Sequence, residues 1–375
     1  MPKYLFYISY LGTRFCGTQF QLNRIGVQNA FNNALALALQ VPSQAISTRL
    51  ASRTDSGVHA LRTSLVTRLS SKITRNQTAF ELKLRNLPGD ENSSTSQSTN
   101  TLDNSNVDDI PFDPDHLAAA VNHILKEMDF DVRVLACRTV SDGFCPRRHA
   151  ILRTYLYRLA VLKSEYDNQI DRPRFFRDPN AILPVVEKNR CWAVDSNFDR
   201  EKFSAAGKLM QGLHNFESFS CTTPSMEKGP PKSMFRNVKL VECLQGQPLI
   251  NPRYDPLAGC FDYIDVLIHS KSFVYRQIRK MVGFMVHVAQ NKAHCSDVRW
   301  LLDHPSPNNW SKYGADLAPS GGLYLMNISY NESDFDNPNP SYEFVEEPER
   351  FESEADEEDF VKKGAEKKNV AKNNE

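Results

Sequence analysis

Two periods of hydrophobic and polar positions run along the chain. Apolar residues alternate with polar ones through residues 3–10 and again through 151–162, which places every second side chain on one face of a strand. In residues 26–40 they return every three or four positions, as on one face of a helix. These patterns predict, in chain order, a strand at 3–10, a helix at 26–40, strands at 46–54 and 62–69, a helix at 114–126, strands at 132–138 and 151–162, a helix at 199–212, strands at 238–244 and 261–269, a helix at 272–290 and a strand at 323–330.

The order strand, helix, two strands, helix, strand occurs twice in this prediction. Each round is a split βαβ unit, as in RRM-like domains, and two such units can join edge to edge. We therefore expect an α+β fold in which two halves, residues 1–140 and 141–330, share one mixed, mainly antiparallel sheet. Helices would cover one face of that sheet, and a catalytic cleft would lie between the halves.

Two stretches have too little apolar content to join such a core. Residues 89–112 are rich in Ser, Thr, Asn and Asp, which predicts a disordered insertion. Residues 331–375 contain 15 acidic and 6 basic side chains and predict a disordered tail, acidic at first and then mixed in charge. Residues 1–330 carry 39 basic and 30 acidic side chains, a modest positive excess that suits a polyanion such as RNA.

Composition argues against several classes of protein. No apolar run approaches the roughly 20 residues that cross a bilayer, and the N-terminus reads as a strand rather than a signal or transit peptide. The 8 cysteines are scattered without a Cys-x-x-Cys pair, so we expect free thiols in a reducing, intracellular compartment and no metal site. The sequence also contains no P-loop and no dinucleotide-binding motif.

Residues 51–60, Ala-Ser-Arg-Thr-Asp-Ser-Gly-Val-His-Ala, contain the most informative side chain, the carboxylate of Asp55. Arg53 precedes it by two positions and Gly57 follows it by two, between two expected strands. One interpretation is a tight turn, since Asp and Ser bond to the backbone and Gly permits a positive φ. The other is a carboxylate fixed on that turn, facing a cleft and oriented for chemistry. The run by itself leaves both interpretations open.

The expected helix at 272–290 has an apolar face with an arginine at its border. At about 100° per residue, Arg276 and Lys280 are expected to point away from the apolar face toward solvent, and Arg279 falls at the edge of that face. A partly buried arginine needs a carboxylate partner, because desolvating the charge alone is costly. Asp55 is a candidate partner. The alternative is a side chain whose charged end reaches water.

Two further segments carry candidate binding residues. The strand at 151–162 places Arg153, Tyr155 and Tyr157 on one face. Aromatic rings with polar tips can stack there on a nucleobase, or they can be half-buried strand residues. Before the last strand, Gly321 and Gly322 let the backbone approach another segment closely.

Together these segments resemble the tRNA pseudouridine synthases of the TruA family, and within it the branch called tRNA pseudouridine synthase-like 1. The matching motifs occur in the family's order and span residues 4–330 apart from the insertion. They are Tyr10-Leu-Gly-Thr-Arg-Phe-Cys-Gly-Thr-Gln, Ser52-Arg-Thr-Asp-Ser-Gly-Val-His-Ala, Arg153-Thr-Tyr-Leu-Tyr-Arg, Leu213-His-Asn-Phe-Glu-Ser-Phe, Ser272-Phe-Val-Tyr-Arg-Gln-Ile-Arg-Lys-Met and Gly322-Leu-Tyr-Leu.

The resemblance implies an isomerase that converts uridine in tRNA to pseudouridine, by breaking the N1–C1′ bond and rejoining the base through C5. Such a reaction needs no redox partner, metal or other cofactor. Asp55 matches the family's catalytic carboxylate, acting as nucleophile or base, with Arg279 as its partner. Arg53 matches the arginine that helps hold the target nucleotide out of the RNA helix, and Tyr155 the ring that packs on the flipped base. His59 lies in the same motif, and we expect it to be structural.

The resemblance also implies a homodimer with one tRNA across both subunits, in the cytoplasm or the mitochondrion. The alternative function is a non-catalytic RNA-binding or tRNA-folding module that kept the fold. The combination of Arg53, Asp55, Tyr155 and Arg279 argues for the enzyme, because a binding module does not need these four residues together.

Overall fold

The computed structural model describes residues 1–69, 111–167, 178–221 and 233–338. The insertion expected at 89–112 lies outside the described residues up to position 110. The tail expected at 331–375 lies outside them from position 339 onward.

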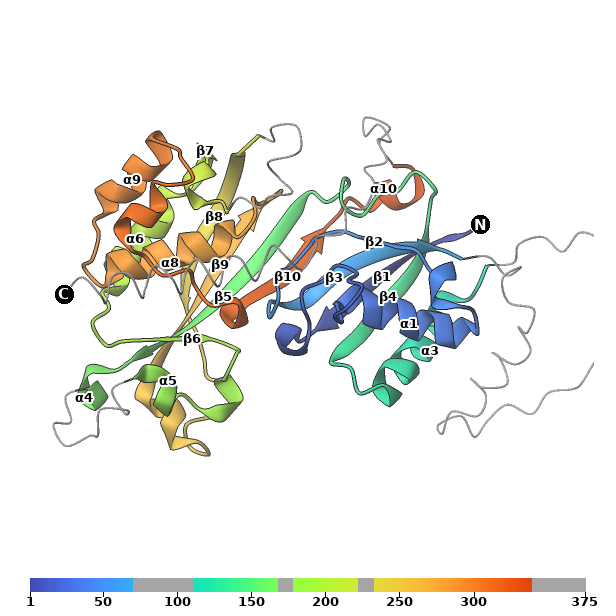
Figure 1. Cartoon of the computed structure of the whole chain (residues 1–375), viewed down its shortest axis with the longest axis horizontal. Coiled ribbons are helices and arrows are strands. Elements are labelled where there is room, and N and C mark those ends of the chain that lie inside the picture. Colours follow the sequence, from blue (N-terminus) through green and yellow to red (C-terminus); the bar gives the residue numbers. More distant parts are fainter. Residues whose placement is uncertain (70–110, 168–177, 222–232, 339–375) are drawn as a thin grey trace, which may run out of the picture.

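One mixed, mainly antiparallel sheet connects the described parts of the chain (Figure 1). Its strands follow the order β4-β1-β3-β10-β5-β9-β8-β7, with β2 paired to β3 and β6 paired to β5. Among these pairs β3–β10 and β5–β6 are parallel. The expectation of an α+β fold on such a sheet is therefore confirmed. The strands are β1 (Lys3–Tyr10), β2 (Thr48–Leu50), β3 (His59–Arg68), β4 (Val132–Val140), β5 (Leu152–Leu162), β6 (Trp192–Val194), β7 (Gly212–Asn215), β8 (Phe235–Gln245), β9 (Phe261–Ser270) and β10 (Leu323–Ser329).

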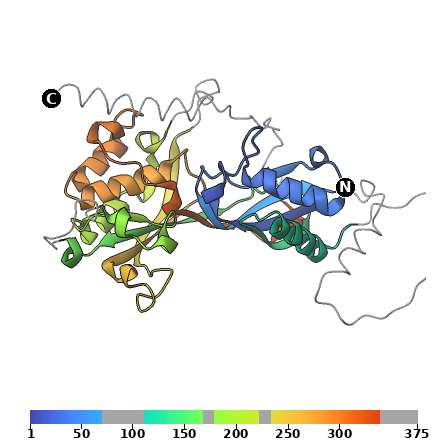
Figure 2. The same cartoon turned by 60° about the horizontal axis from the view of Figure 1, so that its bottom comes forward.

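The longer helices form two groups, one toward each end of the sheet (Figure 2). None of the helices in the described segments combines the length and the apolar content that a membrane span requires. The first group contains α1 (Val27–Leu39) and α3 (Pro114–Glu127), the second contains α6 (Arg200–Leu209), α8 (Gln277–Ala289) and α9 (Cys295–Asp303), and the short helices are α4 (Ser164–Asp167), α5 (Pro179–Ile182) and α10 (Ser333–Asp336).

One continuous core lies between the sheet and both groups of longer helices. At one end Phe6 of β1 packs edge-on against Phe31 of α1, with ring centroids 5.1 Å apart. The same cluster of buried side chains includes Tyr157 of β5 and Met281 of α8. Smaller clusters contain Ile182 of α5 in one case and Phe335 of α10 in the other. Because this core continues across the middle of the sheet, it packs the part of the chain that contains β1 and α1 against the part that contains β5 and α8.

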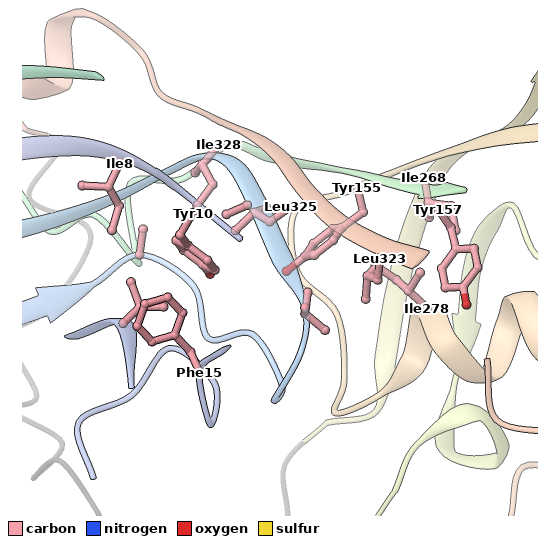
Figure 3. Close-up of a cluster of buried hydrophobic side chains, with 14 of the residues drawn as sticks. Ile8, Tyr10, Phe15, Tyr155, Tyr157, Ile268, Ile278, Leu323, Leu325 and Ile328 are labelled. Carbon is pink, nitrogen blue, oxygen red and sulfur yellow. The ribbon is translucent and has the colours of Figure 1, made fainter. Parts of the chain in front are cut away.

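Strand β10 joins the two ends of the sheet. Tyr324 and Leu325 pair in parallel with His59 and Ala60 at the start of β3. On its other edge Leu325 pairs antiparallel with Tyr155 of β5. Figure 3 shows side chains of the core around this strand, with Tyr10 on one side and Tyr155 and Tyr157 on the other. The segment before β3 and the middle of β5 therefore lie on opposite sides of one strand.

Most expected elements are present, and the differences have simple causes. The strand expected at 46–54 is only Thr48–Leu50, because the residues after it turn into the loop that contains Asp55. The helix expected at 272–290 begins at Gln277. Strands β6 and β7 were not expected, since 3 and 4 residues are too few to display an alternation.

Candidate functional site

Asp55 lies in the loop of residues 51–58 that joins β2 to β3. The N–H of Val58 donates to the carbonyl oxygen of Asp55 at 3.2 Å, which closes a turn over four residues. Gly57, the third residue of that turn, has φ of +76°. A Cβ at Gly57 would lie 2.6 Å from Oγ of Ser320, a hydroxyl that can rotate away, so it is the positive φ that favours glycine here. The turn interpretation is therefore correct, and it fixes the carboxylate in place.

Hydrogen bonds on the N-terminal side of Asp55 hold the same loop. Thr18 donates its N–H to the carbonyl oxygen of Thr54 at 3.1 Å, and its Oγ1 accepts the N–H of Thr54 at 2.7 Å. The buried hydroxyl of Tyr10 lies 2.8 Å from Oγ1 of Thr54. Burial raises the pKa of Tyr10 to about 12, so this phenol stays protonated at neutral pH. The loop is thus anchored to β1 and to the turn around Gly17.

Arg279 of α8 meets Asp55 across 224 positions of sequence. Its Nη1 donates to Oδ2 of Asp55 at 3.2 Å, and its Nε donates to the carbonyl oxygen of Ala318 at 2.7 Å. The two side chains are only 13% and 20% exposed, so solvent screens this ion pair less than it would screen a surface pair. Within the described residues, no hydrogen bond or ion pair falls on the other carboxylate oxygen, Oδ1.

The expectation that Arg276 and Lys280 point to solvent is wrong. Arg276 places its Nε 3.9 Å from Oδ2 of Asp55, with its side chain 15% exposed. Lys280 is buried, and its Nζ donates to the carbonyl oxygens of Ser218 and Ser220 at 3.2 and 2.7 Å. The spacing of apolar residues indicates only the face of α8 that packs on the sheet. Loops pack on the other faces of this helix, so almost the whole of α8 is enclosed.

Tyr155 lies beside the loop of Asp55. Its ring is 7% exposed and meets Phe273 edge-on at 5.2 Å between centroids. Its hydroxyl is 3.3 Å from Oγ of Ser52, three positions before Asp55. Burial raises the pKa of the Tyr155 phenol, and the negative charge of Asp55 adds to that rise, so the group is a neutral hydrogen-bonding phenol. Figure 3 shows its ring beside Leu323 and Leu325 of β10.

Arg53 is the one sequence-predicted site residue with an exposed side chain. In the amide orientation that satisfies both groups, Oε1 of Gln19 accepts hydrogen bonds from Nε and Nη2 of Arg53, each at 3.1 Å. Arg53 therefore stands at the rim of the loop that carries Asp55, and Arg279 and Tyr155 lie further inside.

His59 has a structural environment. It is fully buried, its Nδ1 accepts the N–H of Gly12 at 3.0 Å, and its Nε2–H faces the carbonyl oxygens of Asn189 and Gly321 at 2.8 and 3.1 Å. Burial lowers its pKa, which keeps the ring neutral. The ring also stacks on Tyr324 with centroids 4.6 Å apart. His59 thus fixes the start of β3 against β10.

Arg153 was named from the strand pattern as a face residue, but sequence reasoning missed how it shapes this site. Arg153 is buried and spans three segments: its Nη2 donates to the carbonyl oxygens of Ala51 at 2.8 Å and Arg147 at 3.2 Å, and its Nη1 donates to that of Lys271. The strand alternation placed Arg153 on the correct face, but it gave no indication of these carbonyl partners. Among the described residues, no group of three His, Cys, Asp or Glu side chains is arranged to hold a metal ion.

Comparison with known proteins shows what the chain is similar to. A family model described as tRNA pseudouridine synthase matches residues 206–331. The chain is 28% identical to tRNA pseudouridine synthase-like 1 of Xenopus laevis, covering 88% of this chain and 91% of the relative, and 28% identical to that of Homo sapiens, covering 88% and 90%. It is 27% identical to tRNA pseudouridine synthase A of Rhodopseudomonas palustris, covering 88% and 100%. Over most of its length the chain is therefore similar to tRNA pseudouridine synthases of the TruA type.

Proposed function

We propose that the chain is an isomerase that converts uridine to pseudouridine in tRNA, and that Asp55 is its catalytic carboxylate. The observation that carries the proposal is the ion pair between Asp55 and Arg279, which joins two motifs 224 positions apart beside Tyr155. Relatives named for this activity match most of the chain, and their names supply the substrate class.

The reaction breaks the N1–C1′ bond of uridine and forms a bond between C5 and C1′, while the proton leaves C5 and one is gained at N1. Substrate and product are isomers, so the balance requires no further reactant. Asp55 would act through Oδ1, either by adding covalently to the base or sugar or by removing a sugar proton. Both roles need the ionised carboxylate, which pairs with the Arg279 guanidinium at 3.2 Å.

Tyr155 is suited to receive the base. Its ring forms a buried edge of the site, and its hydroxyl is oriented by Oγ of Ser52 at 3.3 Å. A flipped uridine would pack on this ring, while the neutral phenol assists the movement of the proton at C5.

Arg53 is suited to assist entry of the nucleotide. A stacked or paired uridine must leave the RNA helix to reach Asp55, at a cost of a few kcal/mol. The guanidinium of Arg53 is exposed and lies two positions from Asp55, and in this proposal it would occupy the space that the base vacates. Its charge would also attract the RNA backbone.

The proposed scaffold is a pair of split βαβ halves, residues 1–140 and 141–330, with the RNA in the cleft between them. The order β1, α1, β2, β3, α3, β4 supports such a unit in the first half.

We further propose a homodimer that binds one tRNA across both subunits. Size-exclusion chromatography with light scattering, with and without tRNA, tests the assembly, and imaging of a tagged copy separates cytoplasm from mitochondrion.

The function is tested by incubating the protein with tRNA and mapping pseudouridine at single-nucleotide resolution. Asp55→Asn is expected to lower the rate by at least about 10²-fold, as for the loss of a catalytic acid–base group. Asp303→Asn, at an exposed position at the end of α9, serves as the matched control and keeps the wild-type rate. Equal modification by the wild type and Asp55→Asn would remove Asp55 from the chemistry.

The alternative, a non-catalytic RNA-binding module, makes a different prediction for the same samples. If the protein is such a module, the wild type and every variant should bind tRNA tightly and form no pseudouridine. The geometry favours the enzyme, because a carboxylate at the centre of a basic site weakens attraction to phosphate and so serves no purpose in binding alone.

A further inference from the structure

Arg276 occupies a backbone conformation that its residue type does not favour. It directly precedes α8 with φ of +59° and ψ of +12°, in the left-handed region. The N–H of Gln277 donates to the carbonyl oxygen of Val274 at 3.1 Å, so residues 274–277 form a turn with Arg276 as its third residue. A turn of this type requires a positive φ at that position and ordinarily has Gly or Asn there.

The surrounding structure holds this conformation. Oε1 of Gln277 accepts the N–H of Val274 at 2.9 Å, which closes the same turn a second time through a buried side chain. The carbonyl oxygen of Arg276 accepts the N–H of Lys280 at 3.0 Å in the first turn of α8. Backbone strain that is maintained by its surroundings is concentrated at functional sites, so the side chain at this position calls for an explanation.

The conformation brings the side chain over the reactive carboxylate. Nε of Arg276 lies 3.9 Å from Oδ2 of Asp55, the oxygen that also accepts from Nη1 of Arg279 at 3.2 Å. The guanidinium carbon lies 4.9 Å from the centre of the Tyr275 ring, which supports it from one side. Two arginines thus converge on a single oxygen of Asp55, in a site whose side chains are at most 20% exposed.

We propose that Arg276 is a second positioning residue for Asp55, which together with Arg279 fixes the carboxylate through Oδ2 and presents Oδ1 to the uridine. This inference rests on the proposed function and goes beyond it, since it assigns the reactive oxygen and explains the unfavourable turn residue. With one arginine the carboxylate can rotate about its Cβ–Cγ bond and exchange its oxygens. With two arginines on the same oxygen that rotation breaks both contacts.

The test separates positioning from folding, because the conformation prefers glycine. Arg276→Gly removes the side chain and relieves the backbone, so the melting temperature stays at or above that of the wild type. Its kcat is expected to fall by about 10- to 100-fold, the loss that follows a misplaced reacting group. Asn291→Gly is the matched control: Asn291 follows the other end of α8 with the same φ of +59°, and its replacement leaves kcat unchanged.

Two conservative variants complete the experiment. Arg276→Gln is expected to lower kcat while KM for tRNA changes less than about 3-fold, because the residue acts in the transition state and not in RNA binding. Arg276→Lys restores part of the lost kcat, since it returns the charge without the planar guanidinium. A raised KM with an unchanged kcat would make Arg276 an RNA-binding residue and overturn the proposal, as would wild-type kinetics for both Arg276→Gly and Arg276→Gln.

Comparing Asp55→Asn with Arg276→Gln separates a failure of the positioning role of Arg276 from a failure of the proposed function. An active Asp55→Asn variant in the same assay rejects the role of Asp55 itself. An inactive Asp55→Asn variant beside a fully active Arg276→Gln variant rejects only the positioning role of Arg276.

Discussion

Arg153 donates a hydrogen bond from Nη2 to the carbonyl oxygen of Ala51 at 2.8 Å, across 102 positions of sequence. The same buried guanidinium bonds to the carbonyl oxygen of Lys271, five positions before Arg276. Burial lowers the pKa of Arg153, because taking the guanidinium out of water disfavours its charged form. One side chain of β5 therefore links the loop that carries Asp55 to the segment that leads into α8.

Replacing Arg153 should loosen both segments together. Arg153→Met leaves the buried carbonyl oxygen of Ala51 and two partly buried carbonyl oxygens without their donor. We expect the free energy of unfolding to fall by about 2 kcal/mol, since a buried polar group without a partner costs about 1–3 kcal/mol and the partly buried groups add less. We also expect kcat to fall further than the tRNA affinity, because Asp55 and Arg279 lose their alignment. Chemical denaturation and single-turnover kinetics measure the two effects.

Two variants provide the comparison for Arg153. Arg153→Lys should recover part of the stability, since one ammonium group reaches fewer carbonyl oxygens than a guanidinium. Arg299→Met, at an exposed position in α9, should leave both quantities unchanged. An Arg153→Met protein with wild-type stability would show that the carbonyl groups find other donors.

The strong periodic patterns located most of the fold because burial on one face enforces them. The segment 151–162 forms β5, and the segment 26–40 forms α1, with ends that agree within two residues. Such patterns also placed Arg279 at the border of the apolar face of α8, where the structure joins it to Asp55. The periodicity records which face of an element is buried.

The same patterns failed where loops, rather than the sheet, cover an element. Lys280 lies 4.9 Å from the Trp310 ring, under a loop whose packing leaves no period in the sequence of α8. Arg276 was placed on the solvent side because the helix was assumed to begin at residue 272, whereas a turn occupies those positions. Its φ of +59° is a consequence of tertiary contacts, and nothing in the local residue types indicates it.

Gly322 is required by an aromatic ring. A Cβ at this position would lie 2.7 Å from Cζ of Tyr157, whose ring is fully buried and whose hydroxyl donates to the carbonyl oxygen of Pro319 at 2.8 Å. Because the ring cannot move away, we expect Gly322→Ala to lower the free energy of unfolding by about 1–3 kcal/mol, as for overpacking of a core. Gly259→Ala is the matched control, since its Cβ would meet Pro252 at an ordinary 3.6 Å and should leave stability nearly unchanged.

His59 should make the fold sensitive to acid. The folded protein lowers the pKa of this histidine through burial, so the unfolded chain binds its proton more readily than the folded one. The contribution of neutral His59 is fully present above the unfolded pKa of about 6.5 and is lost as pH falls below it toward the folded pKa. A proton on Nδ1 would also face the N–H of Gly12 at 3.0 Å and break that hydrogen bond.

The measurement for His59 is the slope of unfolding free energy against pH between about 7.5 and 5.5. His59→Gln should be less stable at neutral pH and should show a shallower slope than the wild type. His116→Gln, which changes an exposed histidine at the start of α3, should keep the wild-type slope. Parallel curves for His59→Gln and the wild type would assign the acid sensitivity to other groups.

Ser52 and Tyr155 should act as a pair in catalysis. Oγ of Ser52 lies 3.3 Å from the Tyr155 hydroxyl, between the loop of Asp55 and β5. If this contact orients the phenol, Ser52→Ala should lower kcat by about 3- to 10-fold, the equivalent of one ordinary hydrogen bond of 0.5–1.5 kcal/mol. In a protein that already carries Tyr155→Phe, the same change at Ser52 should have almost no further effect. The double-mutant cycle measures this difference directly.

Ser56→Ala tests the specificity of the coupling. Ser56 lies in the same loop but donates to the carbonyl oxygen of Phe15, so its effect should add to that of Tyr155→Phe. Additive effects for Ser52 as well would mean that the phenol does not depend on this hydroxyl, and the orientation of Tyr155 would then come from its packing against Phe273 alone.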